Sequence, residues 1–177
     1  MKLKYLLCSI ITILVIVPLT GAVQTDQSIL EKAKKIHEEI LTVDTHTDTP
    51  MMLRSPSFDI GKSNDPRKRG GKVDFPRMKD GGLDAVFFAV FIGQGERTPD
   101  GREKAKNNAL SQFKLINKAV ENYPELAELA LTSSDAPDIE KKGERAIFIG
   151  MENGFPVGID ISLVNMFYNL GARYITL

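Results

Sequence analysis

The chain has 177 residues, with 23 basic and 23 acidic side chains, two histidines, one cysteine and no tryptophan. A hydrophobic fraction of 42% excludes a disordered tail, and the balanced charge argues against a nucleic-acid-binding protein. One cysteine excludes a disulfide framework and a cysteine-rich zinc module. Two histidines also leave little imidazole for a metal site built from several histidine ligands.

Residues 1–22 have the pattern of a secretory signal peptide. Lys2 and Lys4 precede an uncharged apolar run over 6–19, and small residues follow at 20–22. The alternative is a membrane anchor, but the run of about 14 residues is shorter than the roughly 20 that span a bilayer. The sequence therefore predicts an exported protein that is periplasmic, extracellular or, if the segment is not cleaved, membrane-associated.

The rest of the chain alternates between helical and strand patterns. Apolar residues at spacings of three and four predict helices over 28–40, 102–122 and 161–170, with a short helical start within 133–140. Short apolar runs predict strands over 41–44, 83–92, 129–131, 146–150 and 172–177, and residues 54–76 have loop composition. This alternation predicts an α/β fold with a parallel sheet.

A first candidate for chemistry is the motif His46-Thr47-Asp48, which we expect in the turn that leaves strand 41–44. Side chains of an extended chain alternate, so His46 and Asp48 point to the same side. An imidazole and a carboxylate placed in this way can bind zinc, manganese, cobalt or ferrous iron. An isolated His-x-Asp motif is a weak signal. The other histidine, His37, is interpreted as an ordinary helix residue.

A second candidate is Glu152, which follows the buried strand 146–150 and lies between Gly150 and Gly154. Taken alone, Glu152 is better explained as a turn or helix-capping residue than as a functional one. The carboxyl ends of parallel strands meet at one edge of the sheet, so Glu152 is expected near His46 and Asp48. A carboxylate has two oxygens and can bridge two metal ions.

Four segments, 42–50, 73–82, 149–154 and 169–177, together resemble the membrane dipeptidase (renal dipeptidase) family of zinc peptidases. The resemblance implies a (β/α)8 TIM-like barrel with two zinc ions. His46 and Asp48 match ligands of one ion, and Glu152 matches the catalytic carboxylate that both ions share. The family hydrolyses dipeptides, often with a D-residue at the C-terminal side, by attack of an acidified water on the peptide carbonyl.

Several family residues have no match in this chain. The other zinc ligands are two histidines on later strands, and Asn153 and Phe155 stand near the family's usual glycine and histidine. We therefore expect residues 23–177 to form the N-terminal half of the barrel domain, weak or inactive alone. An alternative is a non-catalytic metal-binding or interaction remnant of a dipeptidase. Other metal-dependent barrel hydrolases fit less well because they commonly open with His-x-His. Homodimer formation stays open.

Overall fold

The structure, a computed structural model, describes residues 27–68 and 71–177. The predicted signal peptide over 1–22 lies outside these residues. The strands are β1 (Val43–Thr47), β2 (Ala85–Phe91), β3 (Ala127–Leu129), β4 (Arg145–Glu152) and β5 (Ala172–Ile175). The helices are α1 (Gln27–Glu39), α2 (Phe75–Gly81), α3 (Pro99–Glu121), α4 (Asp135–Glu140) and α5 (Ser162–Asn169), with 3₁₀ helices η1 (Thr49–Arg54), η2 (Pro66–Lys68) and η3 (Phe155–Val157).

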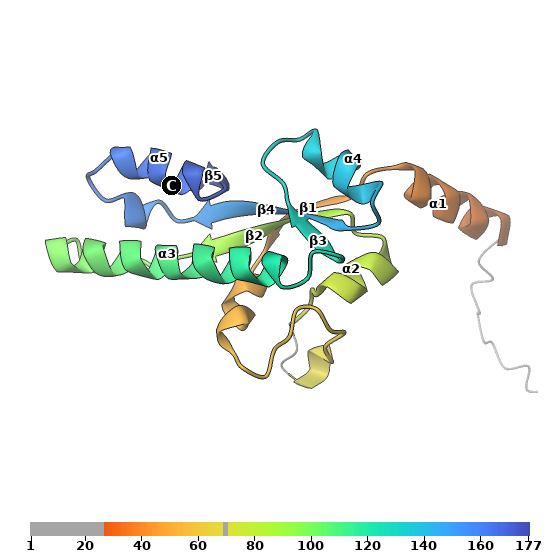
Figure 1. Cartoon of the computed structure of the whole chain (residues 1–177), viewed down its shortest axis with the longest axis horizontal. Helices are drawn as coiled ribbons and strands as arrows, with labels where there is room; N and C mark the ends of the chain where they lie inside the picture. Colours follow the sequence, from red (N-terminus) through yellow and green to blue (C-terminus); the bar gives the residue numbers. More distant parts are fainter. Residues whose placement is uncertain (1–26, 69–70) are drawn as a thin grey trace, which may run out of the picture.

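All strand pairings described are parallel, which confirms the predicted α/β fold (Figure 1). β2 lies between β1 and β4, and it pairs with β4 along its whole length from Ala85 to Phe91. The other edge of β4 is shared, because β3 pairs with its first half and β5 with its second half. The carboxyl ends of β1, β2, β4 and β5 therefore meet at one end of the sheet.

Both faces of the central strands are buried, as their continuous apolar runs predict. On one face, alternate residues of β2 and β4 pack against α3 and α2 (Figure 1). The predicted stripe of α3 is buried there, and Phe113 stacks on Phe167 of α5 at 5.7 Å between ring centroids. On the other face, Phe148 packs with Ala136 and Ile139 of α4.

A buried polar cluster joins the amino ends of three strands. Asp84, just before β2, accepts a 2.9 Å hydrogen bond from the guanidinium of Arg145 at the start of β4. Its other carboxylate oxygen accepts hydrogen bonds from the backbone and hydroxyl groups of Thr42, just before β1, at 2.9 and 3.0 Å. This cluster fixes the relative register of the strands that carry His46 and Glu152 at their opposite ends.

Several local predictions differ from the structure, and β3, for example, covers Ala127–Leu129 instead of 129–131. β1 covers Val43–Thr47 instead of 41–44, so His46 lies within the strand and not in a turn. Glu152 is the last residue of β4 instead of following it. Helix α2 within the segment 73–82 was not predicted; it is capped by the Asp74 side chain and ends at Gly82 in the left-handed conformation, with φ 67°.

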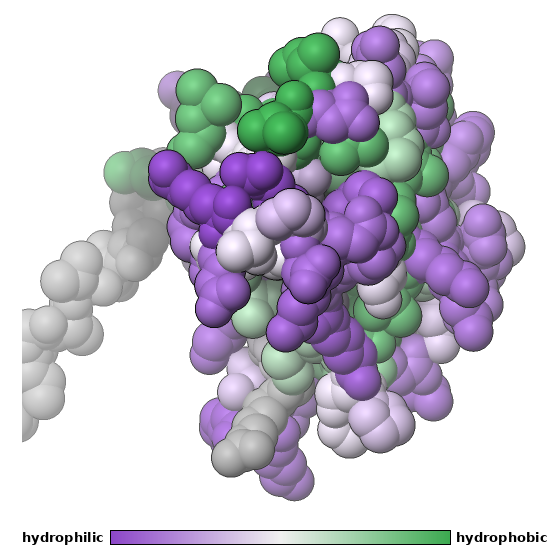
Figure 2. Space-filling model, turned by 90° about the vertical axis from the view of Figure 1, so that its left-hand side faces the viewer, coloured by the Kyte–Doolittle hydropathy of each residue, from purple (hydrophilic) through white to green (hydrophobic). Residues whose placement is uncertain are grey.

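Some apolar surface is exposed in the described part of the chain. Helix α1 has the predicted apolar spacing, yet none of its residues is buried, and Ile36 is 48% exposed. Hydrophobic side chains also stand among polar ones at the end of the molecule seen in Figure 2. Ile159 and Ile161, between η3 and α5, are 85% and 79% exposed. No helix among the described residues is long and apolar enough to cross a membrane.

Candidate metal centre

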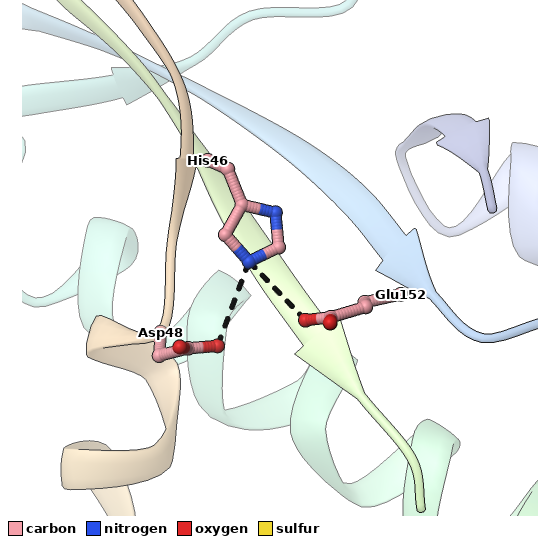
Figure 3. Close-up of side chains that lie close together, drawn as sticks. All are labelled: His46, Asp48 and Glu152. Carbon is pink, nitrogen blue, oxygen red and sulfur yellow. Dashed lines mark ion pairs between the residues drawn. The ribbon is translucent and has the colours of Figure 1, made fainter.

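Three of the predicted side chains meet at the carboxyl end of the sheet (Figure 3). The Nε2 atom of His46 lies 3.2 Å from Oε2 of Glu152 and 3.6 Å from Oδ1 of Asp48. His46 and Asp48 are two residues apart, whereas Glu152 comes from a strand more than a hundred residues later. The fold thus brings together the two candidates that the sequence suggested separately.

The local backbone explains how each side chain reaches the site. β1 and β4 both pair with β2, and Glu152 is in register with Phe91 at the end of that strand. His46 is still in the extended strand, and its backbone N–H donates to the Asp44 carboxylate at 3.0 Å. Asp48 follows the strand and immediately precedes η1, where its carbonyl accepts a hydrogen bond from the Met51 N–H at 3.0 Å. Its side chain therefore turns back toward His46.

The donor atoms suit a divalent transition metal ion. One imidazole nitrogen and two carboxylate oxygens all lie within 4.8 Å of one another. Bonds of about 2.0–2.2 Å to a tetrahedral zinc ion place neighbouring donor atoms about 3.3–3.6 Å apart, close to the 3.2 and 3.6 Å measured from His46 Nε2. Within 27–68 and 71–177, this is the one group of three such side chains.

The site is open to solvent on one side. The side chains of His46, Asp48 and Glu152 are 41%, 62% and 36% exposed, respectively. A bound ion would therefore keep coordination positions accessible to water or to a substrate, as catalytic zinc sites do and closed structural sites do not.

Tyr174 of β5 is a further site residue that sequence reasoning did not single out. Its hydroxyl group lies 3.1 Å from Nδ1 of His46, on the nitrogen that faces away from the carboxylates. Burial raises the pKa of the Tyr174 hydroxyl, and the nearby carboxylates of Glu152 and Asp48 raise it further. The hydroxyl group therefore stays protonated at neutral pH. In the sequence, Tyr174 is only one residue of the predicted strand 172–177, and nothing there marks it as part of a site.

Asn153 shapes the backbone just after Glu152. It has φ 78°, a left-handed conformation that asparagine tolerates better than most residues. Its backbone N–H donates to the Thr176 hydroxyl at 2.8 Å, and its side-chain amide donates to the Ile92 carbonyl at 2.7 Å. Asn153 therefore ties the end of β4 to the chain that follows β2 and to the end of β5.

The other histidine does not join the site. His37 lies on exposed helix α1, and its ring is packed against Gly82, where a Cβ atom would come within 2.3 Å of Nε2. This agrees with its interpretation as an ordinary helix residue. Asp44 does not belong to the group of three, but its bond to the His46 backbone places it directly beside the site.

Known proteins resemble this chain over nearly all of its described residues. The sequence model of the membrane dipeptidase family (peptidase family M19) matches residues 30–177. The chain belongs to the membrane dipeptidase family. Dipeptidase 3 of Rattus norvegicus is 32% identical over 157 residues, which cover 86% of this chain and 30% of the relative. Dipeptidase verJ of Clonostachys rogersoniana is 27% identical over 155 residues, which cover 84% of this chain and 40% of the relative.

Solved structures show the same fold. The probable dipeptidase PvdM from Pseudomonas aeruginosa superposes with a TM-score of 0.73 at 22% identity, covering 84% of this chain and 37% of that one. A metallopeptidase from Rhodobacter sphaeroides, liganded with a phosphinate mimic of the dipeptide L-Ala-D-Ala, gives a TM-score of 0.62 at 20% identity, covering 77% of this chain and 44% of that one. These neighbours support the prediction that the sheet is part of a TIM-like barrel. The chain spans about a third of the length of the curated relatives it matches.

Proposed function

We propose that this chain provides zinc ligands of a dipeptidase centre, with His46, Asp48 and Glu152 as the metal-binding residues. The observation that carries the proposal is the meeting of these three side chains at one end of a parallel sheet, with spacings that suit a tetrahedral ion. Membership of a family of dipeptidases supports the assignment, because the ligand set matches the metal dependence of a metallopeptidase.

Each residue has a distinct part in this proposal. His46 presents Nε2, and Asp48 presents one carboxylate oxygen, so the two hold one ion from the end of β1. Glu152 would contribute a carboxylate oxygen to the same ion, and its second oxygen would be available to a further ion, as the catalytic role that the family resemblance implies for this residue requires. A zinc ion held by these three residues would supply Lewis-acid chemistry, lowering the pKa of a coordinated water and polarising a carbonyl oxygen. The solvent-exposed side of the site leaves room for the peptide bond of a dipeptide.

The proposal also covers the domain, the export and the substrate of the chain. Residues 23–177 form part of the barrel domain, and residues 1–22 direct export of the protein. A dipeptide substrate is supported by the names of the relatives, and a D-residue at its C-terminal side is the variant that we would test first. As in the expectation from the sequence, hydrolysis by the 177-residue chain alone is proposed to be weak or absent.

A hydrolysis assay tests this function. The full chain is loaded with zinc and incubated with a dipeptide that ends in a D-residue, beside Glu152→Gln and the control Glu128→Gln. Glu128 lies on β3 in an ion pair with Lys142 and has no contact with the site. Slow turnover that is lost in Glu152→Gln and kept in Glu128→Gln supports the dipeptidase proposal.

The same experiment separates the second candidate, a non-catalytic metal-binding module. It is favoured by the observation that the described residues hold a single three-residue ligand group with only one histidine. Zinc binding without any turnover would support this module. Turnover that survives Glu152→Gln would contradict the assignment of Glu152 in the dipeptidase proposal.

A further inference from the structure

We propose that Tyr174 is a positioning residue for His46, whose hydroxyl group holds Nδ1 so that Nε2 faces Asp48 and Glu152. The inference rests on the proposed metal site and goes beyond it, because it assigns a role to a residue outside the ligand set. It follows from two observations, the hydrogen bond to the imidazole ring and the way in which the tyrosine ring is fixed.

The hydrogen bond acts on the nitrogen that the metal does not use. The Tyr174 hydroxyl oxygen lies 3.1 Å from Nδ1 of His46, whereas the carboxylates lie near Nε2. A histidine that binds a metal through Nε2 carries its proton on Nδ1, and that N–H needs an acceptor. A tyrosine hydroxyl can accept this bond, so Tyr174 favours the tautomer and the ring orientation that metal binding requires.

The tyrosine ring occupies space that a glycine leaves on the neighbouring strand. Gly150 of β4 is in register with Tyr174 of β5. A Cβ atom at Gly150 would lie 2.0 Å from Cζ of Tyr174, so only glycine leaves space for the ring. The ring also contacts Phe87 at 5.4 Å between centroids, and Phe87 in turn stacks on Phe148 at 4.7 Å.

This arrangement explains why a glycine interrupts the buried run of β4. Phe148, Gly150 and Glu152 alternate along the strand and therefore lie on the same face of the sheet. Phe148 supports the aromatic stack, Gly150 provides the space for Tyr174, and Glu152 reaches the site. All three positions of β4 thus contribute to holding the imidazole ring of His46, which lies on β1 two strands away.

Zinc affinity of the full chain tests the proposal. Tyr174→Phe keeps the ring but removes the hydroxyl group, and Tyr168→Phe is the matched control. Tyr168 is 58% exposed and contacts the Arg173 guanidinium through its ring face, away from His46. Partners of metal ligands are typically worth about 10- to 100-fold in metal affinity, so Tyr174→Phe should bind zinc at least about 10-fold more weakly than the wild type. An affinity within about twofold of the wild type would overturn the proposal.

A second measurement does not depend on the stability of the variant. Nitrogen-15 NMR of the metal-free wild-type chain reports the tautomer of His46 and the hydrogen bond at Nδ1. We expect Nδ1 shifts characteristic of a hydrogen-bonded nitrogen, whereas shifts of a freely hydrated imidazole would overturn the inference. A wild-type chain that binds no zinc would contradict the proposed function, while the NMR result would still decide the role of Tyr174.

Discussion

Replacing Asp84 with alanine should destabilise the chain strongly, because it leaves a buried positive charge without a partner. Arg145 is 6% exposed and Asp84 is 9% exposed, and they form an ion pair with 2.9 Å between nitrogen and oxygen. Removing one member of a buried ion pair costs about 3–5 kcal/mol. The two hydrogen bonds from Thr42 are lost as well, so we expect a value toward the upper end of this range.

Urea unfolding followed by circular dichroism measures this loss as a lower midpoint at an unchanged slope. The control is Asp138→Ala, which removes an exposed partner of Lys141 at 3.0 Å and should leave the midpoint nearly unchanged. The double variant Asp84→Leu with Arg145→Met removes both charges and should recover most of the loss. An Asp84→Ala midpoint equal to that of the control would refute the reasoning, as would a double variant that is less stable than Asp84→Ala.

Three further changes probe the core, a pH-dependent contact and the turn after Glu152. Phe113→Ala, at a side chain 1% exposed, should cost about 3–5 kcal/mol in urea unfolding, and a loss below 1 kcal/mol would contradict its core role. The hydrogen bond from Tyr123 lowers the Asp59 pKa, so this contact adds stability above about pH 4 that is lost as the pH falls through the folded pKa. Tyr123→Phe should therefore reduce stability at pH 7 and flatten its fall below about pH 4, and an unchanged pH profile would argue against the contact. Asn153→Ala should lower the thermal midpoint by more than Asn153→Gly, because glycine accepts φ 78°, and the reverse order would show that backbone strain is unimportant there.

The elements that the sequence predicted well are those whose pattern follows from burial alone. β2 and β4 are buried on both faces, so their apolar runs are continuous, and α3 has one buried stripe at helical spacing. Contacts with the rest of the core decide these patterns, so each pattern is compatible with only one type of secondary structure. The alternation of side chains in an extended chain likewise placed His46 and Asp48 correctly on one side.

The differences arise where distant partners decide the local structure. The residues around His46 are polar and lack the apolar pattern of a strand, and they are extended because β1 pairs with β2. Helix α2 is short, and it depends on the Asp74 cap and on the left-handed Gly82 more than on an apolar stripe. The role of Tyr174 depends on the glycine opposite it in another strand, which a linear sequence does not reveal.

The most direct test of the central claim is zinc binding to the full chain, measured by competition with a chromophoric chelator. We expect one tight site in the wild type and in Glu128→Gln. The affinity should be weaker by more than about 100-fold in His46→Ala and in Glu152→Gln, because the partners of ligands alone are worth up to about that factor. Equal zinc affinity in the wild type and in both site variants would contradict the claim that His46, Asp48 and Glu152 form one metal site.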